Sequence, residues 1–337
     1  MKAIGHFKAL PNDHVEALID LELPRPVPGT RDLLIAVEAV SVNPADYRVR
    51  ARKVDDGQIA VLGWDAAGTV VDVGGDVEGF AIGDAVYYAG DLTRPGTNCE
   101  FQAVDHRIVG HRPKSLSAAA AAALPLTALT AWEALFERLG LSPEKATKPK
   151  TLLIVGGAGG TGSMAIQLAR LVPGLTVIAT ASRPESRAWC EKLGADAVID
   201  HFGDMQTQLA TLGQPGVDFI LILNDPDRHY PVLVEILAPQ GKICSIVPFT
   251  ASPDMNLIMR KSASFAWEFM FTRSMFATAD MAEQRIILNS TAKLIDEGRL
   301  ISPFSENLGS INAANLRTAH ARLEAGRTIG KLVLSGF

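Results

Sequence analysis

The glycine-rich run at residues 151–162, Thr-Leu-Leu-Ile-Val-Gly-Gly-Ala-Gly-Gly-Thr-Gly, constrains the fold more than any other part of the chain. Its apolar beginning predicts a buried strand, and the residues that follow, 163–170, predict a helix. Between them lies the pattern G-x-G-x-x-G, in the strand–turn–helix context in which it binds dinucleotides. Glycine lets the backbone approach a pyrophosphate, and the helix N-terminus supplies N–H donors. The residues predicted to hold a cofactor here are Gly157, Gly159, Gly160, Thr161 and Gly162.

The residues after the next predicted strand, 175–181, indicate which cofactor the chain selects. A chain that selects NAD carries Asp or Glu there, which accepts hydrogen bonds from the ribose 2′-hydroxyl. This chain instead carries Ser182 and Arg183, with Arg187 one helical turn further on. Guanidinium groups pair well with phosphate oxygens, so this set suits a 2′-phosphate and predicts NADP(H). The alternative is that both arginines only form a solvated helix face.

Composition excludes several classes of protein. The 337 residues, 47% of them hydrophobic, suffice for two globular domains, and a formal net charge of −5 gives no sign of a nucleic-acid or anionic-membrane partner. Residues 1–7 lack the apolar core of a signal peptide, and the apolar stretch 118–126 is too short for a membrane span and stops at Pro125. We therefore expect a soluble, cytoplasmic protein. Three widely separated cysteines are expected to be reduced and mostly buried: Cys99, Cys190 and Cys244.

The pattern of apolar runs divides the chain into a β-rich part and an alternating part. Up to about residue 110, short strands such as 33–40 and 68–73 alternate with tight turns. Ser117 is a plausible N-cap for the alanine-rich segment after it, and residues 129–139 predict an amphipathic helix. Strands and helices then alternate, which predicts an α/β fold with a parallel sheet covered on both faces. The predicted strands are 152–155, 175–180, 197–200, 217–223 and 242–247, and a long helix at 280–298 and a strand at 330–335 close the chain.

Several short motifs occur together along the chain, and each is weak by itself. They are residues 43–46, 61–70, 77–86, 96–101, 124–132, 267–273 and 311–317, together with the glycine turn. Through this combination the chain resembles the medium-chain dehydrogenase/reductase superfamily over essentially its whole length. Within that superfamily it looks most like the zinc-free quinone oxidoreductases and enone reductases, and like a bacterial branch often labelled zinc-type alcohol dehydrogenase-like.

The resemblance implies an architecture of two domains. A GroES-like β-barrel domain would comprise residues 1–124 and 266–337, and a doubly wound, Rossmann-type NADP(H)-binding domain would comprise residues 125–265. Substrate and nicotinamide would meet between the two domains. Relatives commonly pair through an edge strand of the nucleotide-binding domain, so the resemblance also implies a homodimer.

The same resemblance speaks against a bound metal. Zinc-dependent members place Cys where this chain has Asn43, His where it has Trp64, and usually Cys near Leu126; the cysteines of their structural-zinc lobe are also missing. Amide, indole and aliphatic side chains do not supply the thiolate or imidazole ligands that catalytic zinc takes. The carboxylates that remain nearby do not by themselves define a zinc site. We therefore predict no metal.

Without a Lewis acid, hydride transfer from NADPH remains possible to a carbon that conjugation makes electrophilic, in a quinone or an α,β-unsaturated carbonyl. The catalytic residues that the resemblance implies are Tyr47, Asn43 and Trp64. Tyr47 would orient or protonate the acceptor oxygen, or be an ordinary half-buried aromatic residue. Trp64 would form an apolar wall, and Asp46 is expected to hold the loop through bonds to the backbone. Further cofactor contacts implied by the family are Asn43, Thr130, Asn224, Val247 and Lys331, the alternative for Lys331 being a solvated side chain.

Two other functions stay open from the sequence. The first is a zinc-dependent alcohol dehydrogenase, and the second is a protein that binds NADPH without catalysis. The leading hypothesis is an NADPH-dependent reductase of a small conjugated carbonyl or quinone.

Overall fold

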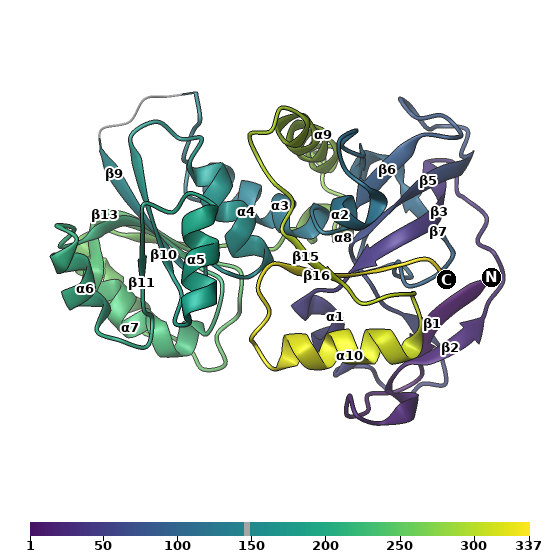
Figure 1. Ribbon diagram of the computed structural model, residues 1–337, viewed down its shortest axis with the longest axis horizontal. Helices are drawn as coiled ribbons and strands as arrows, with labels where there is room; N and C mark the ends of the chain where they lie inside the picture. Colours follow the sequence, from purple (N-terminus) through teal and green to yellow (C-terminus); the bar gives the residue numbers. More distant parts are fainter. Residues whose placement is uncertain (145–148) are drawn as a thin grey trace. The chain divides into compact units, whose positions relative to one another are not determined.

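The chain forms two compact units, and the computed structural model describes residues 1–144 and 149–337. The first unit contains Met1–Leu129 and Phe271–Phe337, and the second contains Thr130–Met270 (Figure 1). The boundaries predicted from the sequence, after residues 124 and 265, lie slightly before these positions. The last part of the chain thus belongs to the same unit as the first part.

The second unit is built on a sheet of six strands, all paired in parallel, in the order β11-β10-β9-β12-β13-β14. Relabelled along the chain, this order is 3-2-1-4-5-6, the order of a dinucleotide-binding sheet, and it reverses between β9 and β12. The strands are β9 (Lys150–Val155), β10 (Leu175–Thr180), β11 (Ala197–Ile199), β12 (Val217–Ile222), β13 (Leu237–Ser245) and β14 (Ser264–Trp267). The sequence predicted the first five of them and missed β14.

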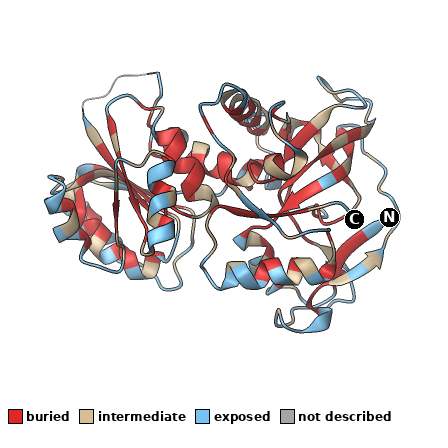
Figure 2. Cartoon of the chain, viewed as in Figure 1, coloured by how far each residue is buried: buried red, intermediate tan, exposed pale blue. Residues whose placement is uncertain are grey.

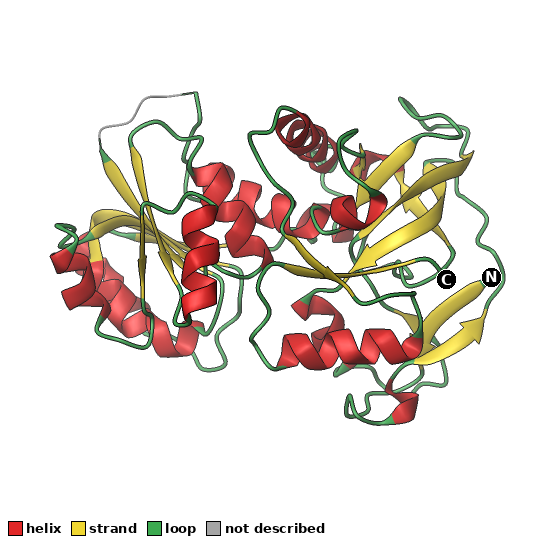
Figure 3. Ribbon diagram, in the orientation of Figure 1, coloured by secondary structure: helices red, strands yellow, loops and turns green. Residues whose placement is uncertain are grey.

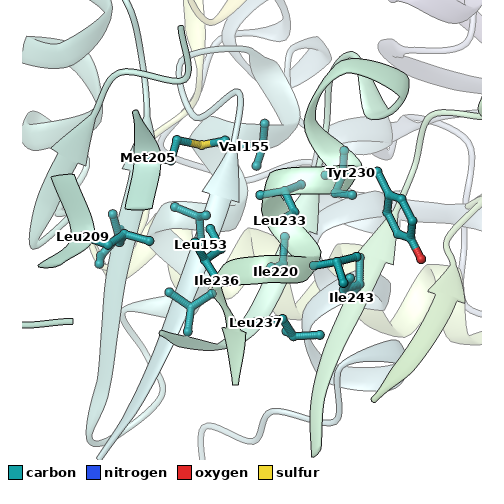
Figure 4. Close-up of a cluster of buried hydrophobic side chains, with 14 of the residues drawn as sticks. Leu153, Val155, Met205, Leu209, Ile220, Tyr230, Leu233, Ile236, Leu237 and Ile243 are labelled. Atoms are coloured by element: carbon teal, nitrogen blue, oxygen red, sulfur yellow. The ribbon is translucent and has the colours of Figure 1, made fainter. Parts of the chain in front are cut away.

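Helices cover both faces of this sheet, so its strands are buried along most of their length (Figure 2). The helices α4 (Gly160–Ala169) and α5 (Pro184–Lys192) pack on β9, β10 and β11. Next to α6 (Met205–Thr211) and α7 (Pro226–Ile236), alternate strand residues such as Leu153, Ile220 and Ile243 join one apolar cluster with Leu233 of α7 (Figure 4). Burial of both faces explains why the strands read as continuous apolar runs rather than as alternating ones.

The first unit consists mainly of strands paired antiparallel (Figure 3). Its larger sheet contains β3 (Asp32–Ser41), β5 (Ala66–Val73), β6 (Ala85–Tyr88), β7 (Phe101–Asp105), β8 (Val109–His111), β15 (Phe304–Asn307) and β16 (Lys331–Ser335). A smaller sheet contains β1 (Lys2–His6), β2 (Ile19–Glu22) and β4 (Ala60–Val61). The helices of this part are α1 (Pro44–Arg50), α2 (Ala118–Ala122), α8 (Thr272–Met275), α9 (Glu283–Asp296) and α10 (Ala313–Glu324). Strand β16 pairs with β3, which brings the end of the chain beside its beginning.

The helical run after Ser117 differs in part from the prediction. The Ser117 side chain accepts a hydrogen bond from Ala120 N, so the predicted N-cap is confirmed. Pro125 does not stop the run, because it is the first residue of α3 (Pro125–Trp132), a position where its missing N–H costs nothing. A π-helical turn, Glu133–Arg138, follows. The whole run Ala118–Arg138 is long and apolar enough to cross a membrane by length and composition, but 72% of its most apolar window is buried in the fold. All three cysteines are unpaired and buried, as expected.

Candidate active site

The glycine turn between β9 and α4 shows which glycines the packing requires. A Cβ on Gly162 would lie 2.5 Å from the carbonyl oxygen of Gly157, and a Cβ on Gly157 would lie 2.8 Å from Cβ of Ala179. These two glycines let helix α4 pack closely against the sheet. A Cβ on Gly159 would meet no atom within 4 Å. Packing therefore does not explain Gly159, and the space beside it is open.

The N-terminus of α4 fits a pyrophosphate. Gly159 precedes the helix with φ −73° and ψ 175°, and no side chain caps the helix there. The N–H groups of the first helical turn, which includes Gly160 and Thr161, have no acceptor inside the helix, and the helix dipole favours a negative charge beside them. The turn also lies at the carboxyl end of β9, where the strand order reverses, which is where doubly wound sheets bind ligands.

The carboxyl end of β10 carries the residues predicted to read the adenosine ribose. Arg183 Nη1 lies 3.5 Å from Glu185 Oε1, and both side chains are partly exposed. Arg187 Nη2 donates a hydrogen bond of 2.6 Å to the carbonyl of Val198, which ties α5 to β11. Arg187 is therefore not simply a solvated residue, and part of its hydrogen-bonding capacity is already used. Ser182 and Arg183 follow the strand after one intervening residue, Ala181, and are half-buried.

Three more predicted contacts belong to the second unit. Asn224 is exposed after β12, and a Cβ on Gly156 would lie 3.4 Å from its Cβ, so Asn224 stands next to the glycine turn. Val247 is half-buried after β13, where its carbonyl accepts a 2.9 Å hydrogen bond from Ser245 Oγ. Thr130 is 4% exposed on α3. Asn224 and Val247 thus lie beyond the carboxyl ends of neighbouring strands, as Gly156 does.

In the first unit, Asn43, Asp65 and Lys331 form a closed and buried triangle of polar side chains. Asn43 Nδ2 donates to Asp65 Oδ2 at 2.8 Å, and Lys331 Nζ donates to Asn43 Oδ1 at 2.5 Å and to Asp65 Oδ2 at 3.0 Å. The lysine also donates to the carbonyl of Val42 at 2.9 Å. The other carboxylate oxygen of Asp65 accepts from Leu126 N at 2.8 Å. The Lys331 side chain is only 5% exposed and is paired inside the unit, so the alternative of a solvated side chain is wrong. Its contact with a cofactor phosphate stays a prediction.

Helix α1 begins at this triangle. Asp46 Oδ2 accepts a hydrogen bond of 2.8 Å from Asn43 N, which fixes the turn into the helix. Burial raises the pKa of Asp46 to about 7, against the opposing effects of the Asn43 hydrogen bond and the Lys331 charge. Tyr47 is half-buried on the same helix, and its hydroxyl has no hydrogen-bond partner among the described residues. This phenol is therefore available to a ligand.

Trp64 occupies a different environment from the one predicted. Its side chain is buried, its indole Nε1 donates to the carbonyl of Asp91 at 3.3 Å, and its ring meets Phe271 edge to face with the centroids 6.2 Å apart. At 2% exposed, the residue is a core side chain of the first unit. The expectation that its ring stacks on a planar acceptor has no support from this burial.

The residues do not fit a catalytic zinc. Asp65 brings together two of the positions that hold zinc ligands in the relatives described above, since it contacts the Asn43 side chain and the Leu126 backbone. Neither residue offers a thiolate or an imidazole, and Trp64 between them in sequence is an indole. Within residues 1–144 and 149–337 no group of three or more His, Cys, Asp or Glu residues is placed to hold a metal ion.

Sequence reasoning missed one further polar cluster, in the second unit. Glu268, which follows β14, is 2% exposed and lies 3.0 Å from Arg138 Nε, and burial and the neighbouring Glu133 raise its pKa. A lone glutamate after a short strand gives little signal. Lys331, the first residue of the apolar strand β16, gives a clearer signal of a buried polar cluster, because a charged residue in a buried strand needs a partner.

Comparisons with known proteins agree with this architecture. Residues 29–124 match the alcohol dehydrogenase GroES-like domain, and residues 193–334 match the zinc-binding dehydrogenase family. A zinc-type alcohol dehydrogenase-like protein of Staphylococcus aureus is 39% identical over 99% of this chain and 100% of its own. The 2-methylene-furan-3-one reductase of Solanum lycopersicum is 39% identical over 94% of this chain and 75% of its own.

Two solved structures extend the comparison. A Rhizobium etli CFN 42 protein, described provisionally as a zinc-dependent alcohol dehydrogenase, has a TM-score of 0.96 and 49% identity over 100% of this chain and 98% of its own. The quinone oxidoreductase of Coxiella burnetii has a TM-score of 0.83 and 28% identity over 100% of this chain and 99% of its own. Proteins named for zinc and proteins named for quinones thus share this fold.

Proposed function

Because the chain belongs to the medium-chain dehydrogenase/reductase superfamily, we propose that it is an NADPH-dependent reductase of quinones or α,β-unsaturated carbonyls that uses no metal. As a member of that superfamily it is an oxidoreductase, and its fold binds a nicotinamide cofactor. The choice of NADPH and of a conjugated acceptor is the proposal.

The preference for NADPH is supported by the end of β10. Neither Ser182 nor Arg183 is an acid that would accept from a ribose 2′-hydroxyl, and a guanidinium favours a 2′-phosphate. Glu185 Oε1 lies 3.5 Å from Arg183 Nη1, and a partly exposed ion pair of this kind is weak, so a 2′-phosphate can compete with the carboxylate for the guanidinium. The open space at Gly159 and the uncapped N-terminus of α4 would hold the pyrophosphate. The bound cofactor supplies the hydride.

The donor set around Asp65 is the observation that carries the choice of acceptor. An amide at position 43, an indole at 64 and an aliphatic side chain at 126 cannot hold the Lewis acid that stabilises an alkoxide during ketone reduction. A quinone or enone needs no such help, because conjugation spreads the developing negative charge over its own π-system. The names of the tomato and Coxiella relatives, an enone reductase and a quinone oxidoreductase, agree with this choice.

Tyr47 is the residue that we propose to act on the acceptor oxygen. Its hydroxyl lacks a partner among the described residues and stands on a helix whose first turn is fixed by Asp46 and Asn43. A phenol can donate a hydrogen bond, or a proton, where charge develops. Asn43 would shape the floor of this site rather than react, since the triangle with Asp65 and Lys331 holds its amide.

The cofactor half of the proposal is tested by steady-state kinetics with NADPH and NADH. Arg183→Ala should raise KM for NADPH by about 10-fold and leave KM for NADH unchanged, because a charge-assisted hydrogen bond to phosphate is lost. Arg170→Ala is the matched control, since Arg170 ends α4 and pairs on the surface with Asp196. Equal use of NADPH and NADH by the unaltered protein would contradict the proposal.

The acceptor half is tested with a panel of quinones, alkenals, ketones and primary alcohols. We expect turnover of the conjugated acceptors alone, and Tyr47→Phe should lower kcat by about 100-fold if the phenol donates a proton. Tight NADPH binding without turnover of any acceptor would indicate a noncatalytic protein. About one zinc per chain, retained through dialysis and needed for alcohol oxidation, would indicate the metal-dependent alternative.

A further inference from the structure

Two buried glutamates meet in the second unit. Glu133 is the first residue of the π-helical turn that follows α3, and Glu268 follows β14. They are 1% and 2% exposed, and their side-chain carboxyl groups are hydrogen-bond partners. An ionised carboxylate only accepts hydrogen bonds, so this contact requires a proton on one of the two groups. Without that proton, neither oxygen of Glu268 receives a hydrogen bond from the described residues. The contact therefore depends on a proton held between the two acids.

The charges around the pair are balanced when it holds one proton. Arg138 Nε lies 3.0 Å from Glu268 Oε2, in an ion pair whose geometry is not that of a hydrogen bond, and its Nη1 lies 3.7 Å from Glu137. On β13, which packs against the turn, Lys242 donates to a backbone carbonyl at the end of the turn. These two cations are balanced by Glu137 and by one carboxylate of the pair. Burial and the partner acid accordingly raise the pKa of Glu268.

No other charged side chain comes from the elements that we find packed against the turn. Cys244 of β13 is buried, and burial together with the Glu268 charge raises the pKa of its thiol to about 12, so the thiol is neutral. Helix α4, which also packs on the turn, contains no charged residue. The state of the pair is therefore set by its own burial and by the charges of the turn and of Lys242.

The pair lies between two residues that are predicted to contact the cofactor. Thr130 comes three residues before Glu133 on the same continuous helical run, so the two side chains lie on one face of it. Beyond β14, Glu268 N donates to the carbonyl of Ser245 at 3.0 Å, and Ser245 Oγ donates to the carbonyl of Val247 at 2.9 Å. The contact thus joins the helix that carries Thr130 to the strand end that carries Val247. All of these residues belong to the second unit.

We propose that Glu133 and Glu268 share one proton and thereby hold Thr130 and Val247 where these residues bind the nicotinamide half of the cofactor. The two acids are positioning residues, because they act through Thr130 and Val247 rather than on the cofactor. The proposal rests on the proposed function only in taking Thr130 and Val247 as cofactor contacts. Loss of the shared proton would place two buried carboxylates against each other, and their repulsion would separate the helical run from the end of β13. The affinity for the nicotinamide half should therefore fall as pH rises.

Fluorescence titrations with NADPH and with NADH from pH 7 to pH 10 test this role. Glu268→Gln keeps a donor for Glu133 and one negative charge beside Arg138. This variant should match the unaltered protein at pH 7 and should bind both cofactors about 10-fold more tightly than the unaltered protein at pH 10, an ordinary coupling between two sites. Glu133→Gln should behave in the same way, because the proton is shared. The same pH dependence in the unaltered protein and in both variants would overturn the proposal.

The adenosine half of the cofactor separates a positioning role from a general loss of structure. The probe 2′,5′-ADP lacks the nicotinamide, so its affinity should change equally with pH in the unaltered protein and in both glutamine variants. Glu235→Gln, at an exposed position on α7, is the matched control and should leave the pH dependence for NADPH unchanged. A gain for 2′,5′-ADP as large as that for NADPH at pH 10 would show that the pair only supports the fold of the unit, and would contradict the proposal.

The shared proton can be observed without any cofactor. In protein labelled with ¹³C at Cδ of glutamate, the resonances of the pair at pH 8 should lie between those of ionised and neutral carboxyl groups, and either glutamine substitution should remove them. Only ionised glutamate resonances at pH 8 would refute the proposal, even if NADPH binds as proposed. Equal affinity for NADPH and NADH with the proton retained would contradict the choice of NADPH and leave this proposal supported.

Discussion

The buried carboxyl group of Asp46 makes a prediction about how stability depends on pH. Asp46 is 1% exposed, one oxygen accepts from Asn43 N, and Oδ1 has no hydrogen-bond partner among the described residues. Burial therefore favours the neutral acid and raises its pKa to about 7 from the ordinary value of 3.8. Between these two values the native state binds more protons than the unfolded state, so this residue lowers stability as pH rises from about 4 to about 7.

The magnitude follows from the size of the shift. A rise of about three pKa units corresponds to about 4 kcal/mol at about 1.4 kcal/mol per unit. Relaxation of the site and access of water reduce the effect in real proteins, so we expect about 2 kcal/mol. Asp46→Asn keeps an oxygen acceptor for Asn43 N and removes the titration. The variant should match the unaltered protein near pH 4 and exceed its free energy of unfolding by about 2 kcal/mol at pH 8.

Urea titrations followed by circular dichroism from pH 4 to pH 8 measure this difference. Other buried acids such as Glu268 also have a raised pKa, so only the difference between variant and unaltered protein isolates Asp46. Asp55→Asn, the same substitution at an exposed position of the same unit, is the control. A constant difference for Asp46→Asn over the whole range would refute the reasoning.

Two other predictions follow from the geometry. Gly162→Ala should lower the free energy of unfolding of the second unit, measured in urea, by about 2 kcal/mol, because the new Cβ would lie 2.5 Å from the backbone oxygen of Gly157. Gly159→Ala should fold normally, because no atom lies within 4 Å of its Cβ, and should weaken NADPH binding measured by fluorescence. Equal stability of the two variants would contradict this. His320 is buried, and desolvation lowers its pKa to about 3, with Arg50 and His6 adding to the effect. The unfolded state therefore binds more protons below pH 6.5, and His320→Leu should gain about 2 kcal/mol over the unaltered protein between pH 7 and pH 5 in urea titrations. No gain on acidification would show that this imidazole does not titrate.

Part of the fold and of the candidate site could be predicted because it depends on neighbours in the chain. The glycine turn is one example, since Gly162 must be glycine for α4 to pack against a backbone only a few residues away. The parallel pairing of the strands in the second unit follows similarly from the alternation of strands and helices. Strand β14 was missed because four residues at the edge of a sheet carry almost no periodic signal.

Other features depended on partners far away in the sequence. Lys331 lies 266 residues from Asp65 and 288 from Asn43, and only the pairing of β16 with β3 brings them together. Trp64 is an aromatic residue of the kind that lines binding sites, yet Phe271 and the carbonyl of Asp91 enclose it. Neither residue type reveals its partner by itself.

The sequence by itself determined that this chain contains a glycine turn of the dinucleotide-binding pattern and a parallel sheet, and that Asn43, Trp64 and Leu126 are not thiolate or imidazole ligands, because steric limits on glycine, strand periodicity and side-chain chemistry are local properties. Only the tertiary structure decided that a lysine neutralises the buried Asp65 and that Trp64 belongs to the core. Burial of a charge is compensated by whichever segment arrives beside it, and that is a property of the folded chain as a whole.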